Sequence, residues 1–371
     1  MDDNTAPTCA PLRWLRGDLH NHCERPELIE EYLSGLPDRL DFIALTNHAQ
    51  KPVFFTQHEM VERARDLLPG FPIFFGLEWN APEGKHACVI FPPAPDEAER
   101  AYAFSRSFDR HVEGSDPRIG PALAFLGELP ADQRPILFFN HPSPGHWPAA
   151  IIERYLAADT EGVVAGIEAL NGHQAFAHIA AWDPLTYPGA AADGLADHVY
   201  RQKRSFALLA HSDFHVHKQE HTPDYTLGVF NHVRVGVAAG ANDAAAIFAA
   251  LRAGRTCAVQ GDWLDLLDCA VGQARLGDCA KVGGETELRF AFAAGEEVRA
   301  VDVIGSFDRG GGTAVLHCFG PQAAGRTELS LAIPPQARGY IRLRFVSASE
   351  KRPGPEAPGP KAFLTSAIFL D

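Results

Sequence analysis

Histidines and carboxylates recur in this sequence in short motifs of a kind that binds metal ions. The first motif, GDLHNH, places His20 and His22 two residues apart. On an extended chain, side chains at positions i and i+2 point to the same face, so both imidazoles can bind one ion. The last motif, HSDFH, repeats this spacing with Asp213 and His215. Neutral imidazole together with carboxylate is the ligand set of zinc, manganese and iron sites.

Five further motifs between these two also carry a histidine or a glutamate. They are LTNH with His48, GLE with Glu78, GKH with His86, NHP with His141 and GIE with Glu168. Most of them adjoin short apolar runs that are predicted to be strands, so their side chains are expected at the strand ends. In a barrel the carboxyl-terminal ends of the strands meet at one mouth, where these motifs would converge.

The combined set is too large for a single ion, because it holds six histidines and two or three carboxylates. We therefore expect two or three divalent ions, which are zinc, manganese or iron, with a carboxylate bridging them. Such ions generate hydroxide from water at neutral pH and neutralise an anionic transition state. The residue types thus predict metal-assisted hydrolysis. Within the set, Glu168 is expected to be a pocket residue or an alternative ligand.

The elements that must position these residues alternate between strand and helix over the first two thirds of the chain. The predicted strands are residues 41–46, 71–76, 87–91, 135–139, 166–170 and 205–210. The predicted amphipathic helices include residues 26–36, 57–68, 148–158, 193–204 and 243–253. Continuously apolar strands are typical of sheets that are buried on both faces, which favours an α/β domain with a parallel sheet or barrel.

The pattern changes after about residue 262, where apolar and polar residues alternate strictly in short runs. These runs are residues 287–292, 298–304, 328–333 and 340–346. With turn-rich segments between them, they predict a small antiparallel β-sandwich. The sequence therefore predicts an α/β domain over residues 1–262 and a β-sandwich domain over residues 263–371. The segment 352–360 is rich in proline and glycine and is predicted to be a loop.

Composition excludes several classes of partner. The chain of 371 residues has 33 Lys and Arg against 47 Asp and Glu, which gives a net charge of −14. Because an acidic surface repels phosphate backbones, general nucleic-acid binding is not expected. Neither a membrane-spanning apolar run nor a basic start with an apolar stretch is present, so we expect no membrane association and no signal peptide. Seven scattered cysteines favour reduced thiols and a cytoplasmic location, and the sequence leaves the oligomeric state open.

The ordered motifs GDLHNH, LTNH, GLE, KHACVIF, NHP and HSDFH resemble those of the PHP (polymerase and histidinol phosphatase) superfamily over about the first 260 residues. The segment LRAGRT and the β-rich tail look like the carbaryl-hydrolase-like branch (CehA/McbA) of that superfamily. The resemblance implies a distorted seven-stranded (β/α) barrel, related to the TIM barrel, and a trinuclear metal centre. Most characterised members hydrolyse phosphoesters, and the named branch includes enzymes that cleave carbamates.

The resemblance also assigns ligands to each ion. It implies that His20 and His22 bind the first ion together with Glu78 and Asp213. Glu78 would bridge to a second ion held by His86 and His141, and the third would be held by His48 and His215. An acidic residue shortly after the first motif usually completes the third site. Here the turn is shortened, which favours Glu24, with Glu27 as the alternative.

Two residues that precede ligands in the sequence have separate interpretations. Asn47 stands where the family often has an acidic residue before the histidine. Asp18 directly precedes the first motif and is expected to orient a ligand from behind instead of binding metal.

The leading hypothesis is a hydrolase that acts on a small phosphate ester through a metal-bound hydroxide. His215 or His211 could then protonate the leaving group. The alternatives are a carbamate, amide or ester hydrolase on the same centre, or a binding protein that keeps the fold without turnover. Arginines or lysines near the metals would favour a phosphate substrate. An aromatic wall would favour a carbamate, and its candidates are Phe54, Phe55, Trp79, Trp147 and Trp182.

Overall fold

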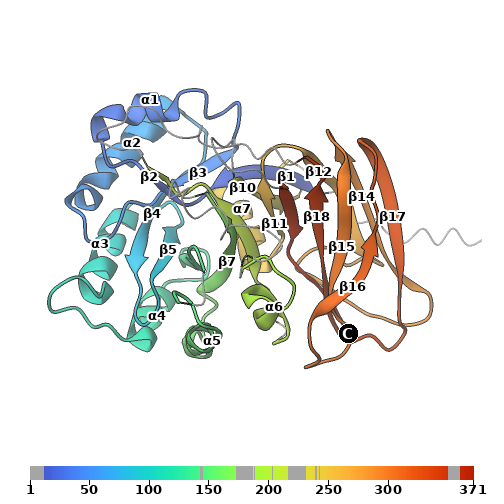
Figure 1. Cartoon of the computed structure of the whole chain (residues 1–371). Coiled ribbons are helices and arrows are strands. Elements are labelled where there is room, and N and C mark those ends of the chain that lie inside the picture. Colours follow the sequence, from blue (N-terminus) through green and yellow to red (C-terminus); the bar gives the residue numbers. More distant parts are fainter. Residues whose placement is uncertain are drawn as a thin grey trace, which may run out of the picture.

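The computed structural model describes residues 12–142, 145–172, 187, 189–202, 204–215, 231–238, 240–241, 243–349 and 360–371. The chain forms a mixed α/β part and an antiparallel β part, which lie side by side (Figure 1). Both parts contribute strands to one large mixed sheet. Within the described residues, no helix is long and apolar enough to cross a membrane.

The α/β part is built on a strongly curved run of strands. In spatial order these are β11 (Thr256–Gln260), β10 (Asn231–Val237), β1 (Arg13–Asp18), β3 (Phe42–Leu45), β4 (Ile73–Asn80), β5 (His86–Phe91), β6 (Ile136–Phe139), β7 (Val164–Asn171) and β8 (Ala207–His211). The helices are α1 (Ile29–Leu33), α2 (Gln57–Leu67), α3 (Glu97–Phe108), α4 (Ile119–Gly127), α5 (Ala149–Ala158), α6 (Leu195–Tyr200) and α7 (Ala244–Ala253). This arrangement confirms the predicted α/β class and the approximate positions of the predicted strands.

The prediction of a parallel sheet is wrong for strands β10 and β5. β10 pairs antiparallel with both β1 and β11. β5 pairs antiparallel with both β4 and β6, whereas the pairs β1–β3, β3–β4, β6–β7 and β7–β8 are parallel. The cause is the connection of residues 81–85, which is too short for the crossover that a parallel partner needs. The reversal brings the start of β5, and with it His86, to the same edge as the ends of its neighbours.

The structure does not show a closed barrel. Within the described residues, backbone pairing ends at β8, which has no ladder to the strands at the other end of the curve. Side chains span this gap instead: Thr256 Oγ1 donates to the Leu208 carbonyl at 2.9 Å, and Ser366 Oγ accepts from the Leu208 amide at 2.9 Å. The sheet therefore curls until β8 faces β11, but the specific seven-stranded barrel remains a prediction.

Alternation along the strands divides the α/β part into two cores. Ile43, Phe75 and other outward-facing residues pack under the helices. Phe42, Phe74 and other inward-facing residues fill the concave side of the sheet, which is closed at one end by α7. Because successive side chains of a strand point to opposite faces, this alternation decides which residues at the strand ends reach the interior.

The C-terminal part consists of strands in two layers. One layer contains β12 (Leu264–Val271), β14 (Thr286–Ala294) and β17 (Gly325–Ile333). The other contains β15 (Val298–Ser306), β16 (Ala314–Phe319), β18 (Gly339–Ser347), β19 (Ala362–Thr365), β20 (Ile368–Leu370) and β13 (Cys279–Ala280). All of these strands pair antiparallel except β13, which pairs in parallel with β20. Phe290 and Phe292 of the first layer meet Phe345 of the second, with ring centroids 6.0 and 5.1 Å apart. The predicted antiparallel strands are confirmed, and most of the predicted loop 352–360 lies outside the described residues.

The two parts are joined by backbone pairing as well as by side chains. β11 pairs with β19, so the large sheet continues across the predicted boundary between residues 262 and 263. Arg342 of β18 also forms a fully buried ion pair with Asp197 of α6. The division into domains 1–262 and 263–371 stays a prediction.

Candidate metal centre

The ends of the strands gather the predicted ligands at one edge of the curved sheet. Two short strands, β2 (Asn21–His22) and β9 (Phe214–His215), pair in parallel and place His22 directly beside His215. Their imidazole rings stack with centroids 4.0 Å apart and planes inclined by 19°. Asp18 holds these two segments together, because its carboxylate accepts from the backbone amides of His20 and Ser212 at 3.2–3.3 Å. Asp18 thus positions the backbone that carries the ligands.

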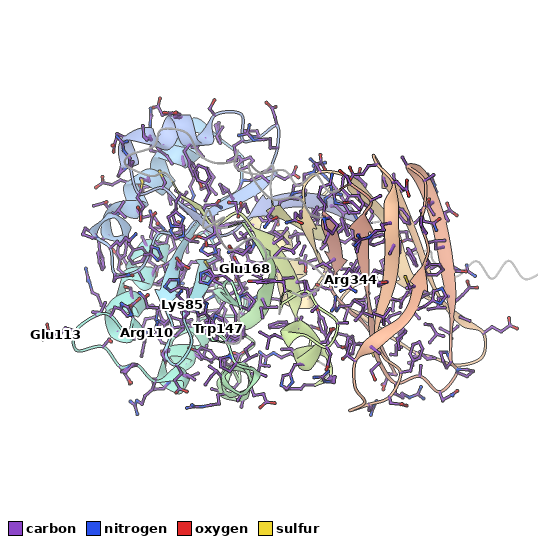
Figure 2. All side chains as sticks on the ribbon, in the orientation of Figure 1. Lys85, Arg110, Glu113, Trp147, Glu168 and Arg344 are labelled. Atoms are coloured by element: carbon purple, nitrogen blue, oxygen red, sulfur yellow. The ribbon has the colours of Figure 1, made fainter. Side chains whose placement is uncertain are left out.

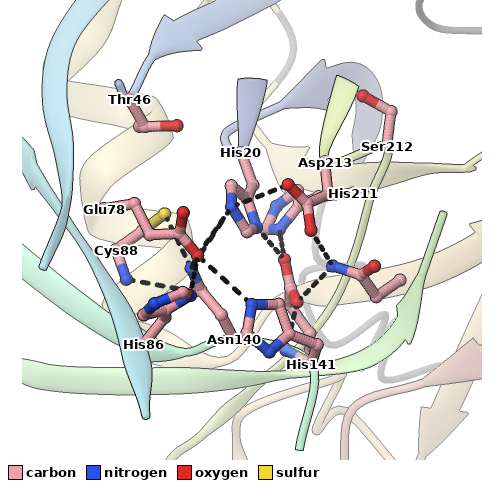
Figure 3. A network of polar contacts seen from close by, with 12 residues as sticks. His20, Thr46, Glu78, His86, Cys88, Asn140, His141, His211, Ser212 and Asp213 are labelled. Atoms are coloured by element: carbon pink, nitrogen blue, oxygen red, sulfur yellow. Dashed lines mark hydrogen bonds and ion pairs between the residues drawn. The ribbon is translucent and has the colours of Figure 1, made fainter. Parts of the chain in front are cut away.

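Glu78 lies at the centre of this group (Figure 3). It is the second-to-last inward-facing residue of β4, and its side chain is 1% exposed. Its Oε1 lies 2.9 Å from His86 Nδ1, 3.2 Å from His141 Nε2 and 3.3 Å from His20 Nε2. Its Oε2 lies 2.8 Å from His48 Nδ1 and 3.4 Å from His22 Nε2. The two oxygens therefore contact different histidines, and a carboxylate shared among so many ligands could serve more than one ion.

Asp213 supplies a second carboxylate on the side of the first motif. Its Oδ1 lies 3.2 Å from His22 Nε2 and 3.3 Å from His20 Nε2. Asp213 and His141 both have backbone φ in the left-handed region, at 51° and 28°. Such conformations are uncommon for residues other than glycine, and they concentrate at functional sites.

Several nitrogens in the group are buried without a hydrogen-bond partner. Both ring nitrogens of His22, Nδ1 of His48 and Nε2 of His211 are in this state. The His48 nitrogen is only 2.8 Å from Glu78 Oε2, yet the contact lacks hydrogen-bond geometry. Because unpaired polar groups are costly to bury, a cation bound by nitrogens such as His22 Nε2 and His48 Nδ1 would satisfy them.

Among the described residues, three overlapping groups have ligand atoms that all lie within 4.8 Å of one another. They are His22, His48 and His215; His20, His22 and Glu78; and His48, Glu78 and His86. Imidazoles and carboxylates in overlapping groups suit more than one divalent transition-metal ion. These groups contain six of the predicted ligands and could hold metal ions, whereas His141, Asp213 and Glu24 are in none of them.

Burial and charge set the protonation of this cluster. Burial and the nearby His215 and His48 lower the pKa of His22 well below its usual value, which keeps this imidazole neutral and able to bind metal. Although burial opposes ionisation of Glu78, His20 and His86 hold the pKa of its carboxyl well below the usual range. Glu78 is thus ionised and His22 neutral, which are the protonation states in which these two groups bind transition-metal ions.

Glu168 lies behind the ligands and uses both oxygens on protein donors. Oε1 lies 2.8 Å from His20 Nδ1 and 3.2 Å from His211 Nδ1. Oε2 accepts from the His141 amide and from Asn171 Nδ2 at 2.5 and 2.8 Å. Although burial opposes ionisation, His20 lowers the pKa of Glu168 to about 2. This geometry is that of a group that orients His20 and sets its tautomer.

Replacing Glu168 with glutamine is expected to weaken metal binding while leaving the fold intact. The amide cannot accept from His20 and His211 with the strength of a carboxylate, so His20 is held less well. Outer partners of metal ligands typically contribute about 10–100-fold to affinity. Calorimetric titration with Mn²⁺ measures this loss. An affinity equal to that of the unmodified chain would contradict the positioning role.

The two histidines predicted to protonate a leaving group differ in access to solvent. The His211 side chain is fully buried and its ring packs against Phe138, with centroids 4.8 Å apart. The side chain of His215 is 11% exposed, and its Nδ1 lies 2.9 Å from the Asp213 carbonyl oxygen. Of the two, His215 is the one that a substrate at the mouth could reach.

The acidic residues after the first motif are also distinguished by the structure. Glu27 is paired with Arg25 at 2.8 Å and its side chain is 61% exposed. Glu24 contacts Lys51 Nζ through Oε1 and lies near enough to His48 and His215 for their charges to interact. The geometry thus favours Glu24 over Glu27 as the residue beside the third predicted site.

Sequence reasoning did not single out two amides that support the centre. Asn140 donates to Glu78 Oε1 at 3.1 Å and accepts from the Cys88 amide at 3.0 Å. Gln57, the first residue of α2, accepts from the Asn47 amide and donates to the Leu45 and Gly76 carbonyls. Asn140 could have been identified from the sequence by its position, because it faces inward one residue after β6. Gln57 has no local signal, because its partners lie on other segments.

The proposed aromatic wall is not formed by the described candidates. Phe54, Trp79 and Trp147 are fully buried in the core under the helices, and the partly buried Phe55 packs against that core. Trp79 follows Glu78 and therefore faces outward, and its Nε1 donates to the Phe108 carbonyl. Trp182 lies outside the described residues. The prediction of an aromatic wall is therefore wrong for these four residues.

Lysine and histidine side chains lie beside the ligands instead. Lys85 directly precedes His86, and its Nζ lies 3.3 Å from His146 Nε2 (Figure 2). The His146 ring in turn lies 6.1 Å from that of His141, between ring centroids. Lys51 stands near His48 through its contact with Glu24. Two lysines therefore adjoin the group of ligands.

No protein-family model matches this chain, and no curated protein matches it.

Proposed function

We propose that this chain is a metal-dependent hydrolase of the PHP superfamily that acts on a small phosphate ester. The observation that carries the proposal is the contact of Glu78 with five histidines, divided between its two oxygens. A carboxylate in this position suits a pair of divalent ions a few ångströms apart. Such a pair supplies a nucleophile from water at neutral pH and neutralises charge that develops on the substrate.

The residues of the centre have distinct proposed roles in metal binding, positioning and proton transfer. His20, His22 and Asp213 would hold one ion, and His86 with His141 would hold another, with Glu78 between them. Glu168 keeps His20 oriented, as its hydrogen bond to Nδ1 requires. His215 lies at the partly exposed side of the group, where it could donate a proton to a leaving group.

The surroundings of the centre support an anionic substrate. Lys51 and Lys85 adjoin the ligands, whereas the described aromatic candidates for an apolar wall are buried elsewhere. A lysine ammonium is a compact positive charge that commonly binds phosphate. A phosphate ester therefore suits these surroundings better than an uncharged carbamate does.

The test compares substrates that share one leaving group. The protein is loaded with Mn²⁺, Fe²⁺ or Zn²⁺ and assayed with 4-nitrophenyl phosphate, bis(4-nitrophenyl) phosphate, a 4-nitrophenyl carbamate and 4-nitrophenyl acetate. We expect turnover of a phosphate ester. Turnover of the carbamate or acetate alone would replace the substrate class, and no turnover with any metal would favour a binding protein.

His20→Ala and Asp213→Ala are expected to abolish this activity with the fold retained. Each removes a ligand from the same side of the centre. Steady-state assays measure the loss, and circular dichroism checks the fold. Unchanged turnover in either variant would contradict the assignment of that residue.

A further inference from the structure

Lys51 contacts the carboxylate that is predicted to complete the third metal site. It closes the turn of residues 48–51 after β3, where its backbone amide donates to the His48 carbonyl at 3.0 Å. Its Nζ contacts Glu24 Oε1, and its side chain is 41% exposed. Glu24 comes two residues after His22, in the shortened turn. The ammonium therefore forms an ion pair with the carboxylate that would complete the third site.

The other groups of that site are close by. His22, His48 and His215 have ligand atoms within 4.8 Å of one another. Glu24 lies close enough to His48 and His215 for their charges to interact, and its described cationic partner is Lys51.

Resting on the proposed function, we propose that the Lys51 ammonium takes the place of a third metal ion, so that the centre holds two ions. A divalent cation at Glu24 would have to displace this ammonium or lie against it, and like charges at such distances repel strongly. Lys51 then supplies positive charge beside the two ions without competing for their ligands. Because the side chain is partly exposed, its charge is available to an anionic group of the substrate.

The experiment counts metal ions in the whole purified chain. Protein is equilibrated with Mn²⁺, free ions are removed, and bound manganese is measured by elemental mass spectrometry. The unmodified chain is expected to hold about two ions, as a paired centre does. Lys51→Met is expected to bind one more ion at Glu24. Lys51→Arg keeps the positive charge and is expected to match the unmodified chain.

Two controls make the count specific. Lys51→Met combined with Glu24→Gln removes the proposed extra ligand and is expected to return the count to that of the unmodified chain. Lys85→Met removes a lysine that also adjoins a ligand but contacts His146 instead of a carboxylate. Its count is expected to stay unchanged.

The outcomes separate this inference from the function on which it rests. A third ion in the unmodified chain overturns the inference and leaves the proposed function standing. The same is true of equal counts in the unmodified chain and Lys51→Met, provided that circular dichroism shows the variant folded. A count below that of a pair in the unmodified chain overturns the proposed function itself.

Discussion

Replacing Glu78 with glutamine is expected to remove most metal binding and all measurable hydrolysis. Glutamine has nearly the same volume, but it is neutral and offers only one oxygen, so it cannot bridge two ions. Loss of a residue that only hydrogen-bonds to a metal ligand already lowers metal affinity by about 10–100-fold. Loss of the bridging ligand itself should lower the metal affinity further. Titration with Mn²⁺ and elemental analysis of the purified variant measure the effect.

Glu153→Gln is the matched control for Glu78→Gln. Glu153 also contacts a histidine, with His198 Nε2 at 2.8 Å from its Oε1, but its side chain is 50% exposed and lies outside the centre. The same chemical change there should leave metal content and turnover unchanged. Metal affinity preserved in Glu78→Gln would show that this carboxylate is not a shared ligand, and the paired centre would have to be abandoned.

The position of Glu78 shows how much of the site could be predicted from the sequence alone. Alternation along β4 separates Glu78, which faces inward, from Trp79, which faces the helices. That alternation can be counted in the sequence once the strand is located. Because neighbouring residues of a strand point to opposite faces, a ligand at Glu78 is incompatible with Trp79 in a wall of the same pocket.

Other features depend on contacts between distant segments. The short connection before His86 was a readable sign that β5 runs antiparallel. By contrast, the pairing of β2 with β9 joins segments that are far apart in the sequence, and no local sequence pattern predicts it. The same holds for the four contacts of Glu168, which make it a positioning group although its motif resembles those of the ligands.

Replacing Asp197 with alanine is expected to lower the free energy of unfolding by about 3–5 kcal/mol, because it leaves a buried guanidinium without its counter-charge. Arg342 Nε and Nη2 donate to the two oxygens of Asp197 at 2.7 Å each, and both side chains are fully buried. Arg342 Nη2 also donates to the Ala191 carbonyl at 3.0 Å. Urea unfolding at fixed pH and fixed Mn²⁺ concentration measures the change, since bound metal also stabilises the folded chain.

Glu328→Ala gives the contrasting case on an exposed pair. Glu328 lies 2.8 Å from Arg326, and both side chains are about two thirds exposed, so its loss should change stability by less than about 1 kcal/mol. Arg342→Met combined with Asp197→Leu should recover most of the stability lost in Asp197→Ala, since apolar side chains need no counter-charge. If Asp197→Ala cost no more than Glu328→Ala, water would have to reach Arg342, and the contact between α6 and β18 would have to be open in solution.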